Sequence, residues 1–252
     1  MIFKGKTVII SGGASGMGLL AGQCFSKEGA NIVLVDVNEA AAKEKAEEIC
    51  AGGGRAIGVA ADVRDYSQVT GAVEAAVKEF KTADIMINCA GGAETRILSH
   101  LVQGREFKDI PIEVYDWGID VNLKGQFYFD HAVMKYMAEQ KSGVIINIGS
   151  ISGEEGSTAS VAYSTAKSGA MNGLTKSLAQ YGAKYNVRCV CISPGPVLTR
   201  EAMANMKTAM GRAAEPQEIV DLMMYVASDK GAFMTGINIL IDGGRNIMSN
   251  KE

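Results

Sequence analysis

The sequence has little of the features that mark several common classes of protein. It contains two histidines, His100 and His131, so a histidine-based catalytic triad or a zinc site has little support. Its net charge is −3 with both signs mixed along the chain, which leaves no basic surface for nucleic acid or an anionic membrane. No apolar run approaches the roughly 20 residues of a membrane-spanning helix. We therefore expect no metal site, no nucleic-acid partner and no membrane partner.

The sequence also has few cysteines and lacks the pattern of a secretory signal peptide. The five cysteines are Cys24, Cys50, Cys89, Cys189 and Cys191. They form neither a CxxC pair nor the spacing of metal ligands, and the last two lie in an apolar run where buried thiols are expected. Residues 1–6 lead directly into an apolar run, so we expect no signal peptide. These features predict a cytoplasmic protein without disulfides.

What the sequence does contain is an alternation of short apolar runs and helical patterns. We expect strands at residues 7–11, 31–36, 55–60, 85–88, 144–150, 188–193 and 237–242. Ser67 is expected to cap the third helix, which should run to about Phe80. At 252 residues, this alternation predicts a single α/β domain over residues 1–252, ending in a short polar tail from residue 246.

The first apolar run breaks into a glycine-rich turn, residues 12–18 (GGASGMG), and a helical pattern follows. We expect Gly12 to permit the tight turn, and Gly16 and Gly18 to let the backbone approach a pyrophosphate at the helix N-terminus. The second run ends in Asp36, which is placed to bind the adenosine ribose and to repel a 2′-phosphate. No Arg or Lys stands at positions 37 or 38, so the sequence predicts NAD over NADP. The alternative for Asp36 is an N-cap of the next helix.

A second group of polar residues follows residue 144. Ser150 ends an apolar run, and Tyr163 and Lys167 stand four residues apart in a helical pattern, which places them on one helix face. A cation beside a phenol favours the phenolate, so Tyr163 would exchange a proton with an alcohol or a carbonyl. Ser150 would hydrogen-bond the same substrate oxygen. Taken alone, a Tyr/Lys pair is more often a chance pair; the glycine-rich turn favours the catalytic interpretation.

In order and spacing, these motifs resemble those of the short-chain dehydrogenase/reductase family over nearly the whole chain. Residues 11–18 resemble TGxxxGxG with Ser first, residues 88–91 (NCAG) resemble NNAG, and residues 194–199 resemble PGxVxT. The resemblance implies a single-domain Rossmann fold, a doubly wound parallel sheet of about seven strands flanked by helices. It also implies a homotetramer, or a homodimer, in which the helix from residue 113 to 139 and the next one form the interface.

The resemblance also implies roles for individual residues. The implied catalytic residues are Asn122, Ser150, Tyr163 and Lys167. The implied cofactor-binding residues are Gly12, Ser15, Gly16, Met17, Gly18, Asp36, Asp62, Val63, Asn88, Ala90, Gly91, Tyr163, Lys167, Pro194, Gly195, Val197 and Thr199. We therefore expect an NAD(H)-dependent oxidoreductase that interconverts a secondary alcohol and a ketone.

The sequence leaves the substrate open. It would be a small alcohol or ketone, with a polyol, a sugar or a hydroxysteroid as candidates. Two alternative functions remain: a 3-oxoacyl-[acyl-carrier-protein] reductase, against which Asp36 argues, and a non-catalytic NAD-binding regulator, against which the complete catalytic set argues.

Three variable segments would surround the substrate. Residues 92–112, which include Arg96, either shape the substrate site or form a solvated loop. Glu154 and Glu155 either hydrogen-bond a polyhydroxylated substrate or face water, and we favour water. Residues 200–210 contain Met203, Met206 and Met210 and form either a lid or a packed helix.

Overall fold

The computed structural model describes residues 1–249; the end of the expected polar tail, residues 250–252, lies outside the described part. The strands are β1 Thr7–Ser11, β2 Asn31–Asp36, β3 Arg55–Ala60, β4 Ile85–Asn88, β5 Gly143–Ile148, β6 Val187–Pro194 and β7 Asn238–Ile241. All of these strands run parallel in one sheet, in the order β3-β2-β1-β4-β5-β6-β7. The first six follow the Rossmann order, so the predicted fold class is confirmed.

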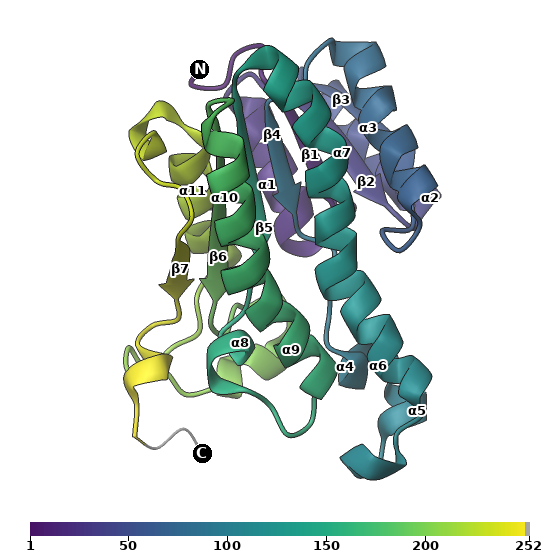
Figure 1. The fold of residues 1–252 in the computed structure, drawn as a ribbon, viewed down its shortest axis with the longest axis vertical. Coiled ribbons are helices and arrows are strands. Elements are labelled where there is room, and N and C mark those ends of the chain that lie inside the picture. The colour runs from purple at the N-terminus through teal and green to yellow at the C-terminus, as the bar shows by residue number, and fades with distance from the viewer. Residues whose placement is uncertain (250–252) are drawn as a thin grey trace.

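Helices cover both faces of this sheet (Figure 1). The α-helices are α1 Gly16–Lys27, α2 Glu39–Ala51, α3 Tyr66–Phe80, α4 Glu94–Ile97, α5 Ser99–Val102, α6 Ile112–Ile119, α7 Gly125–Gln140, α8 Ser152–Glu155, α9 Val161–Gly169, α10 Thr175–Ala183 and α11 Pro216–Ala227. The 3₁₀ turns are η1 Phe107–Asp109, η4 Glu201–Asn205, η5 Asp229–Gly231 and η6 Arg245–Ile247, and the π turns are η2 Asp120–Lys124 and η3 Ala170–Leu174. Within residues 1–249, no helix is both long enough and apolar enough to cross a membrane.

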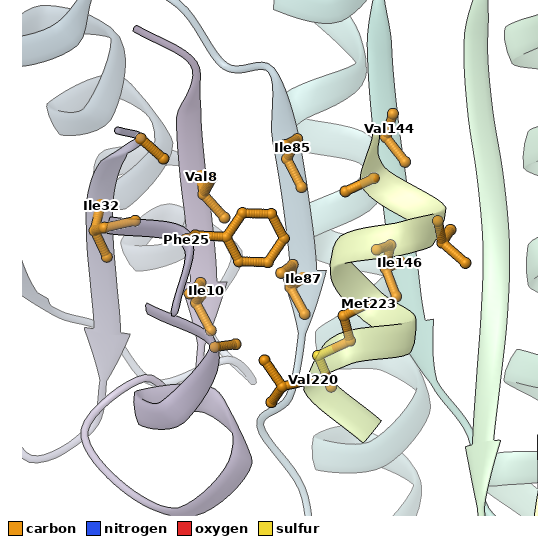
Figure 2. Packing of buried hydrophobic residues seen from close by; sticks show 14 of the residues in the cluster. Val8, Ile10, Phe25, Ile32, Ile85, Ile87, Val144, Ile146, Val220 and Met223 are labelled. Atoms are coloured by element: carbon orange, nitrogen blue, oxygen red, sulfur yellow. The ribbon is translucent and has the colours of Figure 1, made fainter. Parts of the chain in front are cut away.

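The sheet separates two apolar cores. Successive side chains of a strand point to opposite faces, so β1 contributes Val8 and Ile10 to one core and Ile9 to the other. The first core lies under α1, α2 and α11, and Figure 2 shows Phe25 of α1 and Met223 of α11 against the strands. The second core lies under α3, α7 and α10. Because both faces are covered, every residue of β1 and β5 is buried, and each strand contains a continuous apolar run, residues 8–10 and 144–146, rather than an alternation with polar residues.

The topology creates a crevice between β1 and β4. From β1 the chain builds outward through β2 and β3, then crosses back to β4 on the other side of β1. The turns that leave β1 and β4 therefore meet at the carboxyl edge, and a Cβ on Gly12 would lie 2.8 Å from the Cα of Ala90. Gly12 also has a φ of +65°, which L side chains rarely adopt. In open α/β sheets, ligands bind at such a switch point.

Two helices differ from their predicted form. The third helix is capped by Asp65, not by Ser67, because the Asp65 carboxylate accepts the backbone N–H of Ser67 (2.8 Å) and of Gln68 (3.3 Å). The helix predicted at residues 113–139 runs from residue 112 to 140, but the π turn η2 interrupts it. That turn holds Asn122, and π turns often occur at functional sites.

Candidate active site

A cleft of about 730 Å³ opens at the carboxyl edge of the sheet. In Figure 1 the strand arrowheads point toward the end of the molecule where α4, α8 and α9 lie. The predicted residues that line the cleft are Gly12, Ser15, Gly16, Met17, Gly18, Asp36, Asp62, Val63, Ala90, Gly91, Ser150, Tyr163, Lys167, Pro194, Gly195, Val197 and Thr199. Of the predicted set, Asn88 and Asn122 do not line it. Segments far apart in the chain thus meet around one cavity.

The glycine-rich turn forms one end of the cleft. The N-cap of α1 is Ser15, whose side chain makes no capping hydrogen bond, so the first-turn N–H groups of α1 have no cap from this side chain. A Cβ on Gly18 would collide with the carbonyl oxygen of Gly12. Gly18 therefore lets α1 pack against the turn, in addition to the predicted approach of the backbone to a ligand. A helix N-terminus in this setting suits a pyrophosphate, so these residues fit a dinucleotide.

Asp36 lies beside this turn at the end of β2. One carboxylate oxygen accepts the N–H of Ala14 (3.2 Å) and the other accepts the N–H of Asn38 (3.1 Å). The N-cap of α2 is Asn38, whose side chain accepts from Ala41, so the alternative of Asp36 as the helix cap is wrong. Asp36 instead joins the glycine-rich turn to β2 and lines the cleft.

Among the described residues, one other acid, Asp62, and one cation, Arg64, line this end of the cleft. Arg64 donates from Nε to the carboxylate of Asp62 at 3.0 Å, and this hydrogen bond lowers the pKa of Asp62. The Arg64 cation thus already has an anionic partner.

The Ser/Tyr/Lys group lies at the opposite end of the cleft. Lys167 is 3% exposed, and its Nζ donates to the carbonyl of Ile148 at the end of β5 (2.6 Å). The same Nζ lies 5.6 Å from the centroid of the Tyr163 ring. The Oγ of Ser150 accepts from the N–H of Ser152 (3.1 Å), and Ser150 shares the cleft with Tyr163 and Lys167. The strand-end hydroxyl and the helix pair are therefore brought to one site, as the sequence predicted.

Asn122 is fully buried behind the cleft. Its Oδ1 accepts the N–H of Gly92 (2.9 Å), and its Nδ2 donates to the carbonyls of Gly92 (3.0 Å) and Gly118 (2.9 Å). A Cβ on Gly91 would lie 2.6 Å from the Asn122 Oδ1 and 3.5 Å from the Lys167 Nζ. Asn122 thus fixes the turn after β4 directly beside Lys167.

Asn88 also lies beneath the cleft rather than in it. Its Nδ2 donates to Asp130 of α7 (2.7 Å) and to the side-chain oxygen of Asn147 on β5 (2.9 Å). Asp130 is fully buried, and burial raises its pKa to about 7 while the Asn147 and Asn88 hydrogen bonds lower it. Asn88 would therefore contribute to cofactor binding by holding in place the turn that follows β4.

Glu94 is a site residue that the sequence reasoning missed. It is 0% exposed, and its two carboxylate oxygens accept the backbone N–H groups of Ala162 (2.9 Å) and Tyr163 (3.1 Å). The adjacent Thr95 hydroxyl lies 2.7 Å from that of Ser160. Residues 94 and 95 thereby hold the N-terminus of α9, which carries Tyr163 and Lys167. The sequence showed only an acid in a loop of mixed charge, and the contact spans 68 positions.

The substrate end is formed by two of the variable segments. Arg96 and Ile97 of the 92–112 segment line the cleft, as do Met203 and Met206, whereas Met210 is exposed. The segment after Thr199 forms the short turn η4, none of whose residues is buried, so it is not a packed helix. Both segments thus contribute side chains to the cleft.

The acids at positions 154 and 155 lie outside the cleft lining. Arg245 Nε donates to Glu155 at 3.2 Å, and this ion pair is largely buried, with side-chain exposures of 12% and 15%. The expectation that both acids face water is therefore wrong for Glu155, because a partner from the C-terminal segment covers it. Glu154 is exposed and accepts from Asn238 at 3.4 Å.

Comparisons with known proteins found similarity along nearly the whole chain. The family model described as enoyl-(acyl carrier protein) reductase matches residues 12–246. The chain is 38% identical to trans-4-hydroxycyclohexanecarboxylate dehydrogenase of Sinomonas cyclohexanicum, over 97% of this chain and 94% of that protein. It is 32% identical to L-rhamnose 1-dehydrogenase (NAD(P)(+)) of Azotobacter vinelandii, over 97% and 98%. The crystal structure of gox2181 superposes with a TM-score of 0.88 at 28% identity, covering 97% of both chains.

Proposed function

This chain belongs to the short-chain dehydrogenase/reductase family, and on that premise we propose that it interconverts a secondary alcohol and a ketone with NAD(H). The chain is an oxidoreductase that acts on CH–OH groups, and its family uses nicotinamide cofactors. The observation that carries the proposal is the convergence of Ser150, Tyr163 and Lys167 in the same cleft as the glycine-rich turn.

In the proposed mechanism the protein orients the substrate and moves one proton. Tyr163 takes the proton from the alcohol hydroxyl, or returns it to the ketone oxygen, and Ser150 donates a hydrogen bond to that oxygen. Lys167, whose Nζ donates to the Ile148 carbonyl, would bind the nicotinamide ribose and, as a nearby cation, would favour the phenolate of Tyr163 during proton transfer. Asn122 supports the proton relay by fixing the turn beside Lys167. The bound nicotinamide carries the hydride.

We propose NAD rather than NADP as the cofactor. Asp36 would accept hydrogen bonds from the adenosine ribose, and its charge would repel a 2′-phosphate. Position 37 is a valine with 74% of its surface exposed, so it offers no cation to that phosphate. Arg64, the cation that lines this end of the described cleft, is paired with Asp62.

A reductase of acyl-carrier-protein substrates is the second candidate, because the matching family model carries such a description. The named relatives favour a smaller alcohol, since their names refer to a hydroxycyclohexanecarboxylate and to rhamnose. An NAD-linked assay over polyols, sugars, hydroxysteroids, hydroxy acids and β-hydroxyacyl thioesters separates these possibilities. Reduction of NAD⁺ by a small secondary alcohol is the expected result. If no compound in any class supports hydride transfer while NADH binds, the protein is instead a cofactor-binding regulator.

We also propose that the protein is a homotetramer. Exposed aromatic side chains occur on both sides of the sheet. Phe127 of α7 and Tyr181 of α10 lie on the helices over one core, whereas Tyr225 lies on α11 over the other core, and Phe233 follows the turn η5 that comes after α11. Two exposed surfaces of this kind would support the two different contacts that a tetramer requires. Light scattering coupled to size exclusion should give four times the chain mass; a monomer would contradict the proposal.

A further inference from the structure

Two arginines from separate segments face the substrate end of the cleft without an acidic partner. Arg96 belongs to α4, and Arg200 directly follows Thr199. Both arginines line the cleft, as do Thr199 and Tyr163. Within residues 1–249, neither guanidinium forms an ion pair with a carboxylate. The side chain of Arg200 donates only to the sulfur of Met203, at 3.5 Å, among its described contacts. Two unpaired cations in one pocket favour an anionic ligand.

Arg96 lies close to the turn that follows β4. Its guanidinium folds back over Gly92, so that a side chain at position 92 would collide with the Arg96 Nη2. Gly92 itself is held by both ends of the Asn122 amide, and the neighbouring Gly91 lies beside Lys167. Arg96 is an exposed residue whose guanidinium lies against the backbone of Gly92, next to the catalytic group.

The two guanidinium groups also interact with each other. Burial lowers the pKa of Arg96, the positive charge of Arg200 lowers it further, and Tyr163 raises it. A bound anion would relieve this repulsion, because each guanidinium can give two parallel N–H donors to a carboxylate. Both groups thus lie within electrostatic range of the reacting end of the cleft.

The remaining charges of the cleft do not compete for such an anion. The acids among its described lining residues are Asp36 and Asp62, both at the adenosine end. Arg64 is paired with Asp62, and the Lys167 ammonium is bound to the Ile148 carbonyl. The cleft lining includes the apolar side chains of Ile97, Trp117, Ile151, Met203 and Met206 beside the hydroxyls of Ser152, Ser157 and Ser160.

We propose that the substrate is a hydroxy acid or oxo acid with a hydrocarbon body, and that Arg96 and Arg200 bind its carboxylate. This inference rests on the proposed function, because Tyr163 would act on the hydroxyl or ketone of the same molecule. The apolar lining would contact the hydrocarbon body, and the arginines would set the orientation of the carbinol carbon toward the catalytic group. The pyrophosphate of the cofactor is the other anion that the cleft would hold, and the glycine-rich turn provides for it at the N-terminus of α1.

The test compares hydroxy acids with the carboxamides of the same acids. The probes are secondary hydroxy acids from 3-hydroxybutyrate to 3-hydroxycyclohexanecarboxylate, each beside its amide, with wild type, Arg96→Gln and Arg200→Gln. Arg105→Gln is the matched control, because Arg105 is an exposed arginine of the same segment that does not line the cleft. We expect each cleft variant to raise KM for the acid by about 10- to 100-fold, the range for a lost charge-assisted hydrogen bond, with KM for NAD⁺ unchanged.

Binding is measured independently of turnover through Trp117, the single tryptophan of the chain, which lines the cleft. Acids should change its fluorescence at concentrations at which the amides do not, and Arg96→Gln should abolish that difference. Equal binding of acid and amide, or a rise in KM for NAD⁺ instead of for the acid, would overturn the inference. Arginine-dependent binding of the acid without any hydride transfer would instead refute the proposed function alone.

Discussion

The contact between Glu94 and the first turn of α9 leads to a prediction about both stability and catalysis. In Glu94→Ala, the N–H groups of Ala162 and Tyr163 lose their acceptors, and Ala162 is only 4% exposed. Loss of a helix cap costs about 0.5–2 kcal/mol, and hydrogen bonds to a charged group are worth about 1.5–3 kcal/mol each. We therefore expect the free energy of unfolding to fall by about 2–4 kcal/mol.

That loss is large enough to measure by thermal denaturation. For a chain of this size, each kcal/mol shifts Tm by about 2–4 °C, so Glu94→Ala should melt about 5–15 °C below wild type. Glu94→Gln keeps one acceptor oxygen, so its Tm should lie between those of wild type and Glu94→Ala. Glu113→Ala is the matched control, because Glu113 is exposed in the first turn of α6, and it should change stability by less than about 0.5 kcal/mol.

Catalysis should fall along with stability, since α9 carries the phenol. A displacement of about 1 Å in a reacting group costs about 10²-fold in rate, so kcat should fall more than the affinity for NADH does. NADH fluorescence titration and steady-state kinetics, both well below the Tm of the variant, give the two quantities. If Glu94→Ala has the same Tm as wild type and retains full kcat, the carboxylate neither stabilises α9 nor positions Tyr163.

Three further predictions concern single side chains. Tyr163→Phe should lower kcat by at least about 10²–10⁴-fold while NADH still binds, and retained turnover would refute the role of the phenol. Asp36→Ala should relax or reverse the preference for NAD over NADP, as measured by kcat/KM with each cofactor. Burial raises the pKa of Asp130 to about 7, from an ordinary value of 3.8. The neutral carboxyl therefore stabilises the fold fully below pH 3.8, and this contribution is lost as pH rises to about 7, so over this interval Tm should fall more in wild type than in Asp130→Asn. Equal slopes in the two proteins would contradict this.

Several features could be predicted from the sequence because they depend on local pattern. The apolar runs and the helical patterns between them specified the strands and most helices, since burial on both faces of a parallel sheet requires continuous apolar strands. The glycine-rich turn was recognisable from the spacing of its glycines. The structure shows why glycine is required at positions 12 and 18, where the backbone conformation or close packing excludes a Cβ. The spacing of Tyr163 and Lys167 placed both on one helix face.

The sequence by itself determined the order of strands and helices, the glycine-rich turn and the identity of the Ser/Tyr/Lys group. The tertiary structure alone decided that Glu94 holds α9, that Asn122 holds Gly92, and that Arg96 lies in the same pocket as Arg200. The physical reason is the range of the forces involved. Backbone propensity and hydrophobic periodicity act over a few neighbouring residues, whereas these contacts join positions 30 to about 100 apart, which meet only after the sheet and its helices have packed.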